Sequence, residues 1–177
     1  MILSPGKVYE LALSTIKPDQ VSEFLGGYIP QILPLMAEYG GRFVINGPVE
    51  RSVAGTYAVG SFAILEWPSI DAFAAIGGDR RVKPLLDRRN RCLEVIHEGW
   101  FYGVSGEAEL PVGQGRCLCL RLSTDSGREP GTAVRLMRVD HPHNLAPAVC
   151  LDVSADRSPA MTAEDIDALV VVVSPAE

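Results

Sequence analysis

The sequence predicts an α+β fold built on a ferredoxin-like β-α-β-β-α-β module. Two observations in the first hundred residues predict it: four apolar stretches with strand character, and two stretches whose apolar residues recur at three- and four-residue steps, as in helices. Their order is that of the split βαβ unit, so we expect the sheet order 4-1-3-2. The composition agrees, because 47% hydrophobic and 21% charged residues in a chain of 177 are typical of a globular protein.

The first strand and helix are predicted from residues 8–40. Residues 8–16 form a strand with apolar residues on both faces, and Asp19 is a candidate cap for the helix that follows. Pro30 and Pro34 fall within the apolar stripe of that helix, so we expect a kink or two short helices. Gly40 supplies a helix stop.

The remaining elements of the module follow in order. Residues 42–46 form a short strand that Gly47-Pro48 turns, and residues 57–67 form a long one that Pro68 ends. Ser69 caps a second helix, which is interrupted at residues 77–79 and resumes over 82–93. Residues 94–102 complete the sheet.

The second half differs from the first in its charge and in its pattern of predicted elements. We therefore divide the chain into a module (residues 1–103), a linker (104–114) and a β-rich C-terminal region (115–177). The two sides of Gly103 carry net charges of −1 and −5. Strands are expected over residues 115–124, 133–139, 148–154 and 169–173, with a helical turn over 162–167 capped by Thr162.

One internal similarity links the halves. Residues 6–15 align with residues 115–124, and five of the ten positions are identical. The C-terminal region is therefore either a decayed second copy of the module or an arm that extends a partner's sheet; strand sequences also converge by chance.

Composition and charge exclude several classes of function. A net charge of −6 and a pI of about 5.1 argue against nucleic acid as a partner. No apolar stretch approaches the roughly 18 residues of a membrane span, and the start lacks signal-peptide character, so we expect a cytoplasmic protein. The four cysteines, at positions 92, 117, 119 and 150, form no C-x-x-C pair. We therefore predict neither a metal nor a cofactor.

Strand alternation suggests a candidate site. In the first strand, Glu10 and Ser14 fall on the face with smaller or more polar residues, which we assign to a cavity, and the other face to the helices. His97 on the fourth strand would then be a cross-strand neighbour of Glu10, and a His–Glu pair in an apolar cavity suits proton transfer. Tyr57 and Ser61 on the third strand could bind a substrate oxygen. A one-residue slip would reverse these faces, and His97 could equally be a structural histidine.

Two further polar clusters each have two interpretations, a functional one and one as an ordinary solvated surface. Arg88 and Arg89 could clamp a carboxylate or another anion of the substrate, or they could lie on a solvated helix face. His141 and His143 flank Pro142, which favours a solvated loop over a metal site, although such a loop could reach the cavity mouth.

Residues 8 to about 103 resemble the bacterial domain-of-unknown-function family 1330, within the dimeric α+β barrel superfamily. The matching motifs are the opening Tyr9 strand, the Pro-containing helix that leads into residues 39–43, residues 65–69 before an Ala-rich helix, and His97-Glu98-Gly99. The sequence departs from the family at residues 78–82, where a Ser-Pro-Glu-Tyr-like run is usual. The resemblance implies two sheets associated as a barrel, between two chains or within one; relatives in the superfamily include cofactor-free monooxygenases, polyketide cyclases and haem enzymes.

These observations lead to two hypotheses on function. The first is a small cofactor-independent enzyme that acts on an apolar organic molecule in the barrel cavity, by cyclisation, isomerisation or oxygenation. Natural-product tailoring fits the high-GC bias of the residue usage. The second is a non-catalytic ligand-binding or stress-related barrel protein. In both cases we expect a homodimer with no nucleic-acid or membrane partner.

Overall fold

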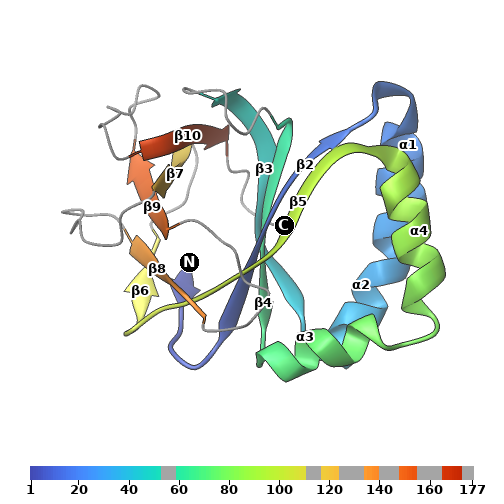
Figure 1. Cartoon of the computed structure of the whole chain (residues 1–177), viewed down its shortest axis with the longest axis horizontal. Helices are drawn as coiled ribbons and strands as arrows, with labels where there is room; N and C mark the ends of the chain where they lie inside the picture. The colour runs from blue at the N-terminus through green and yellow to red at the C-terminus, as the bar shows by residue number, and fades with distance from the viewer. Residues whose placement is uncertain (53–58, 111–116, 124–133, 140–147, 155–164, 173–177) are drawn as a thin grey trace.

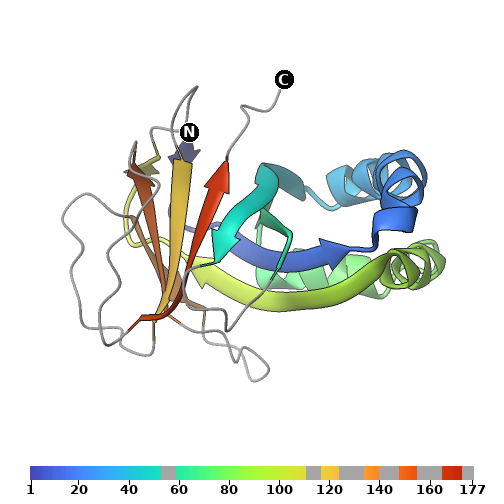
Figure 2. The ribbon, with the colours of Figure 1, turned by 90° about the horizontal axis from the view of Figure 1, so that it is seen from above.

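A computed structural model describes residues 1–52, 59–110, 117–123, 134–139, 148–154 and 165–172 of the chain. Over these residues it shows a mixed α+β protein in which eight strands form a closed barrel and the described helices form a layer on one side of it (Figures 1 and 2). Among the described residues, no helix is long and apolar enough to cross a bilayer. Tyr57, His141, His143 and Thr162 lie outside the described residues.

The first half forms the expected module. Its strands are β2 (Val8–Ile16), β3 (Arg42–Ser52), β4 (Ser61–Trp67) and β5 (Leu93–Gly103), all paired antiparallel in the order β3-β4-β2-β5. This is the 4-1-3-2 order that the element sequence predicts. β3 is longer than expected: Gly47 and Pro48 do not turn the chain but pair with Phe62 and Ser61 within the β3–β4 ladder.

The first helical segment is interrupted, as expected, and the interruption lies just before Pro30. It consists of a 3-10 turn η1 (Pro18–Gln20), a short α1 (Val21–Glu23), a π-helical turn η2 (Phe24–Tyr28) and α2 (Ile29–Glu38). Pro30 lies in the first turn of α2, directly after the π-helical turn, and Pro34 lies inside α2. Asp19 makes no capping hydrogen bond and instead accepts from the Gln20 amide.

The second helical segment begins and breaks as expected. Ser69 Oγ accepts a hydrogen bond from the Ala72 N–H at 3.2 Å and caps α3 (Ile70–Gly77). α4 (Val82–Cys92) follows after the interruption at Gly78-Asp79. All helices cover the same face of the β3-β4-β2-β5 sheet (Figure 1).

The second half supplies the other side of the barrel. β7 (Cys117–Ser123), β8 (Val134–Arg138), β9 (Ala148–Ser154) and β10 (Asp165–Val172) pair in the order β10-β7-β9-β8, again 4-1-3-2. β8 pairs with β5, and β10 pairs with β3, so the barrel closes within one chain. The helical turn expected over 162–167 is wrong for residues 165–167, which belong to β10.

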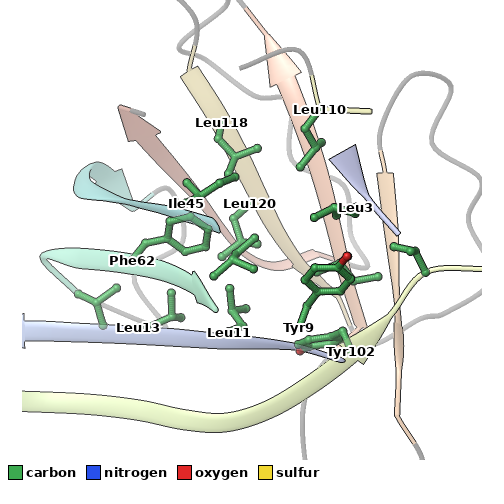
Figure 3. Packing of buried hydrophobic residues seen from close by; sticks show 14 residues of the cluster. Leu3, Tyr9, Leu11, Leu13, Ile45, Phe62, Tyr102, Leu110, Leu118 and Leu120 are labelled. Atoms are coloured by element: carbon green, nitrogen blue, oxygen red, sulfur yellow. The ribbon is translucent and has the colours of Figure 1, made fainter. Parts of the chain in front are cut away.

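The internal similarity of the sequence coincides with equivalent positions in the fold. The aligned residues Leu11 and Leu120 lie on the first strand of each half and are both fully buried in the barrel core; Tyr9 and Leu118 form a second such pair (Figure 3). From the repeated strand order and these matched burial positions we propose that the C-terminal region is a second copy of the module rather than an arm that extends a partner's sheet.

A small two-stranded sheet packs against the barrel core. β1 (Ile2–Leu3) pairs with β6 (Ala108–Glu109), and Leu3 and Leu110 are buried among the barrel side chains (Figure 3). Residues 104–110, which the sequence indicates as part of a linker, are therefore packed on the barrel over the described part.

Candidate functional site

The buried carboxylate of Glu10 lies between the sheet and the helices. It is 5% exposed, and the neighbouring face residues Val8 and Ala12 pack against a cluster that includes Ile32 and Met36 of α2. A carboxylate has a strong preference for water, so its burial in an apolar layer requires local hydrogen bonds. The structure supplies them from two neighbouring strands.

Two N–H groups point at this carboxylate. Trp67 Nε1 on β4 donates to Glu10 Oε2 at 3.1 Å, and the backbone N–H of Gly99 on β5 donates as well. Gly99 has φ of +76°, and the β2–β5 register shifts beside it, between Leu11 and Leu13. This is the geometry of a glycine bulge, which releases a backbone N–H from the ladder and turns it toward a side chain.

Burial raises the pKa of Glu10 from its ordinary value of 4.5 to about 7. The desolvation of the charged form is the largest cause, and the nearby Glu98 carboxylate adds to it. The Trp67 and Gly99 hydrogen bonds and the Arg89 charge act in the opposite direction. With a pKa of about 7, the Glu10 carboxyl group can take up and release a proton near neutral pH.

The π-helical turn η2 places a second polar group in this region. Tyr28, at its end, is 7% exposed and its hydroxyl lies within hydrogen-bonding reach of Arg89. Arg89 in turn forms a bidentate ion pair with Glu98, with N–O distances of 2.6 and 2.8 Å. Glu10, Tyr28, Trp67, Arg89 and Glu98 therefore form the candidate site.

The face assignment predicted from strand alternation is wrong. Tyr9, Leu11 and Leu13 point into the barrel, whereas Glu10 lies beneath the helices. Both faces of β2 are buried, so polarity does not distinguish them. Small side chains such as Ala12 let the helices approach the sheet, and the larger ones fill the barrel.

His97 does not contact Glu10. In the β2–β5 ladder, His97 lies opposite Leu13 and Glu10 lies opposite Phe101. Because directly opposed residues share a face, His97 is on the barrel side, where its ring stacks on Trp100 at a centroid distance of 5.9 Å. The predicted His97–Glu10 cross-strand pair is therefore not formed.

The structure brings together Ser14 and Ser61, two of the residues predicted to bind substrate. They are directly paired on β2 and β4, their hydroxyl oxygens are 2.7 Å apart, and Ser61 Oγ donates to the Ser14 carbonyl at 3.0 Å. They lie on the helix-facing side with Glu10, four residues further along β2.

Both arginines predicted to bind a substrate anion, Arg88 and Arg89, are already paired with carboxylates of the protein. Arg88 pairs with Glu23 and donates to the Gly27 carbonyl, and Arg89 pairs with Glu98. Arg89 is nevertheless part of the candidate site through Tyr28, whereas Arg88 ties α4 to the turn η2.

The barrel interior is a packed core over the described residues, not the expected cavity. Tyr9, Leu11, Phe62 and Tyr102 from the first half meet Leu118 and Leu120 from the second (Figure 3). The buried polar groups around Glu10 lie instead in the helix–sheet layer. Tyr28, Trp67 and Glu98 were not predicted from the sequence as members of the candidate site. The adjacent Gly26-Gly27 pair was the available signal for the irregular turn that positions Tyr28.

One family model and several solved structures match the chain. The family model described as Domain of unknown function (DUF1330) matches residues 8–96. None of the curated proteins matches the chain. A solved structure of a protein of unknown function from Rhodopseudomonas palustris is 22% identical, covering 53% of this chain and 79% of its own, with a TM-score of 0.46.

Two other solved structures resemble nearly the whole chain. An anthrone oxidase-like protein is 12% identical with a TM-score of 0.58, over 98% of this chain and 94% of its own. A Lactobacillus acidophilus protein provisionally named a monooxygenase is 11% identical with a TM-score of 0.53, over 94% of this chain and 93% of its own. At these identities the likeness shows a shared fold.

Proposed function

The chain belongs to the family described as Domain of unknown function (DUF1330), and on that premise we propose that it is a cofactor-independent enzyme that moves a proton between Glu10 and an apolar organic substrate. The observation that carries the proposal is the buried Glu10 carboxyl group, with its pKa raised to about 7 beneath an apolar helical layer. A general base is most effective when its pKa lies near the working pH.

The surrounding groups suit the removal of a proton beside a carbonyl. Glu10 would accept the proton from carbon, and the electron pair left behind would move onto the substrate oxygen. The Tyr28 hydroxyl, which lies in the same region and is oriented by Arg89, is a donor of the kind that stabilises such an oxyanion. Substrate entry requires the first helical segment to separate from the sheet, and the π-helical turn is the natural point of adjustment.

Oxygenation without a cofactor is one form of this chemistry. An anthrone that loses a proton to Glu10 becomes a carbanion able to donate electrons to molecular oxygen. The overall reaction consumes one anthrone and one O2 and yields one anthraquinone and one water. The anthrone oxidase-like neighbour makes anthrone a suitable first probe, and this chemistry belongs to the tailoring of aromatic natural products.

The test compares Glu10→Gln with wild type. Glutamine keeps the acceptor for Trp67 Nε1 but cannot take a proton, so we expect O2 consumption with anthrone to fall by about a hundredfold or more. Glu66→Gln is the matched control, because Glu66 is also buried but lies on the barrel side of β4, paired with Arg42. Equal rates in wild type and Glu10→Gln would reject Glu10 as the base.

The packed barrel interior favours a second candidate, a non-catalytic protein that binds a small ligand or acts under stress, with Glu10 as a structural group. A 13C NMR titration separates the two: an acid–base role requires a Glu10 pKa near 7, whereas a value below about 5 would support the structural role.

A further inference from the structure

A polar cleft of about 780 Å³ lies apart from Glu10, where the end of β2 and the start of the first helical segment meet the end of α4. This volume is in the range of small-molecule sites. Three cationic side chains, Lys17, Arg88 and Arg91, face two carboxylates, Asp19 and Glu23, so the lining has one positive charge in excess.

The Arg88 side chain is already used in contacts within the protein. It pairs with Glu23, donates to the Gly27 carbonyl at 3.2 Å, and lies so close to Gly27 that a Cβ there would be 2.6 Å from its terminal nitrogen. The Arg88–Glu23 pair is thus a neutral wall of the cleft, and the free positive charge must come from the other two cations.

Lys17 and Arg91 are held side by side by hydrogen bonds to the end of α4. The Lys17 backbone N–H donates to the Cys92 carbonyl at 2.9 Å, and Lys17 Nζ donates to the Arg91 carbonyl at 2.8 Å. The second bond uses one of three Nζ donors. Within the described part of the chain, the exposed Arg91 guanidinium makes no hydrogen bond or ion pair.

We propose that this cleft binds the carboxylate group of a small organic acid between Lys17 and Arg91. The guanidinium offers two parallel N–H groups that match a carboxylate, and Lys17 adds a point charge with unused donors. A single negative charge balances the excess of the lining, which favours a carboxylate over a phosphate dianion. Ser22 and Gln20 add polar groups to the same wall. This site is independent of the role of Glu10.

The experiment is an NMR titration of the intact protein with benzoate, with benzyl alcohol as the neutral counterpart and inorganic phosphate as the competing anion. We expect benzoate to shift the backbone amide signals of Lys17 and Cys92 with millimolar affinity, and to bind more tightly than either of the other probes. Arg91→Gln and Lys17→Met should each weaken benzoate about tenfold, the loss expected for one charged hydrogen-bonding partner.

Arg80→Gln is the matched control, since Arg80 is another exposed arginine, located before α4 and outside the cleft. It should leave the benzoate affinity unchanged. Because the exposed Arg91 side chain makes no hydrogen bond or ion pair within the described residues and acts on Glu23 only through its charge, Arg91→Gln should change the melting temperature little. The proposal is overturned if benzoate causes no shifts, if Arg91→Gln binds it as well as wild type does, or if benzyl alcohol or phosphate binds equally well.

Discussion

The indole Nε1 of Trp67 donates a hydrogen bond of 3.1 Å to Oε2 of Glu10 across two neighbouring strands of the sheet. The two residues are diagonal neighbours, because Trp67 lies opposite Val8 and Glu10 lies opposite Leu65. Both are almost fully buried beneath the helices. This bond holds a titratable group in a fixed orientation inside an apolar layer, and the burial of that group makes the stability of the protein depend on pH.

The stability of the wild type should fall between pH 4.5 and 7. The folded protein keeps the Glu10 proton up to about pH 7, whereas the unfolded chain releases it near 4.5, so the folded state binds more protons in this range. The contribution is complete below pH 4.5, is lost as pH rises through 7, and amounts to about 3 kcal/mol. Denaturant unfolding of wild type and Glu10→Gln at several pH values measures it; parallel curves for the two proteins would contradict it.

Replacing Trp67 with phenylalanine should raise the pKa of Glu10 above its wild-type value. The substitution removes a hydrogen bond that favours the ionised carboxylate, while the ring still fills most of the space. The 13C carboxyl signal of Glu10, followed by NMR against pH, reports the change directly. A midpoint that stays at the wild-type value would show that the indole does not act on the carboxylate.

Gly41→Ala should destabilise the protein by about 1–3 kcal/mol, the range for overpacking a core. A Cβ on Gly41 would lie 2.3 Å from the six-membered ring of Trp67, which is 2% exposed and has little room to move. Gly26→Ala is the control, because its Cβ would meet nothing within 4 Å. Thermal unfolding compares them, and an equal effect of the two substitutions would argue against the close approach at Gly41.

Leu11→Ala and Leu120→Ala should each cost about 2–5 kcal/mol, as expected for large cavities in a core. These two leucines occupy equivalent positions on the first strands of the two halves, and both are fully buried. Leu25→Ala, at a position 56% exposed, should change stability little. If Leu120→Ala behaved like Leu25→Ala in denaturant unfolding, the second half would not share the barrel core.

The sequence alone determined the elements and their order. The apolar run in residues 8–16, the cap at Ser69 and the glycine stop at Gly40 are local signals, and each corresponds to an observed strand, helix start or helix end. The 4-1-3-2 sheet followed from that order. The π-helical turn at Phe24–Tyr28 could not be predicted from the order of elements, because it depends on how the helix packs against Arg88 and the sheet.

Only the tertiary structure decided where Glu10 points and which residues surround it. β2 is buried on both faces, by helices on one and by the second half of the chain on the other, so hydrophobic alternation cannot say which face receives the carboxylate. The unbroken β2–β4 register places Trp67 diagonally beside Glu10. The bulge at Gly99 changes the β2–β5 register, so that the Gly99 N–H meets Glu10 while His97 faces the barrel. Both outcomes arise from contacts between segments far apart in the chain.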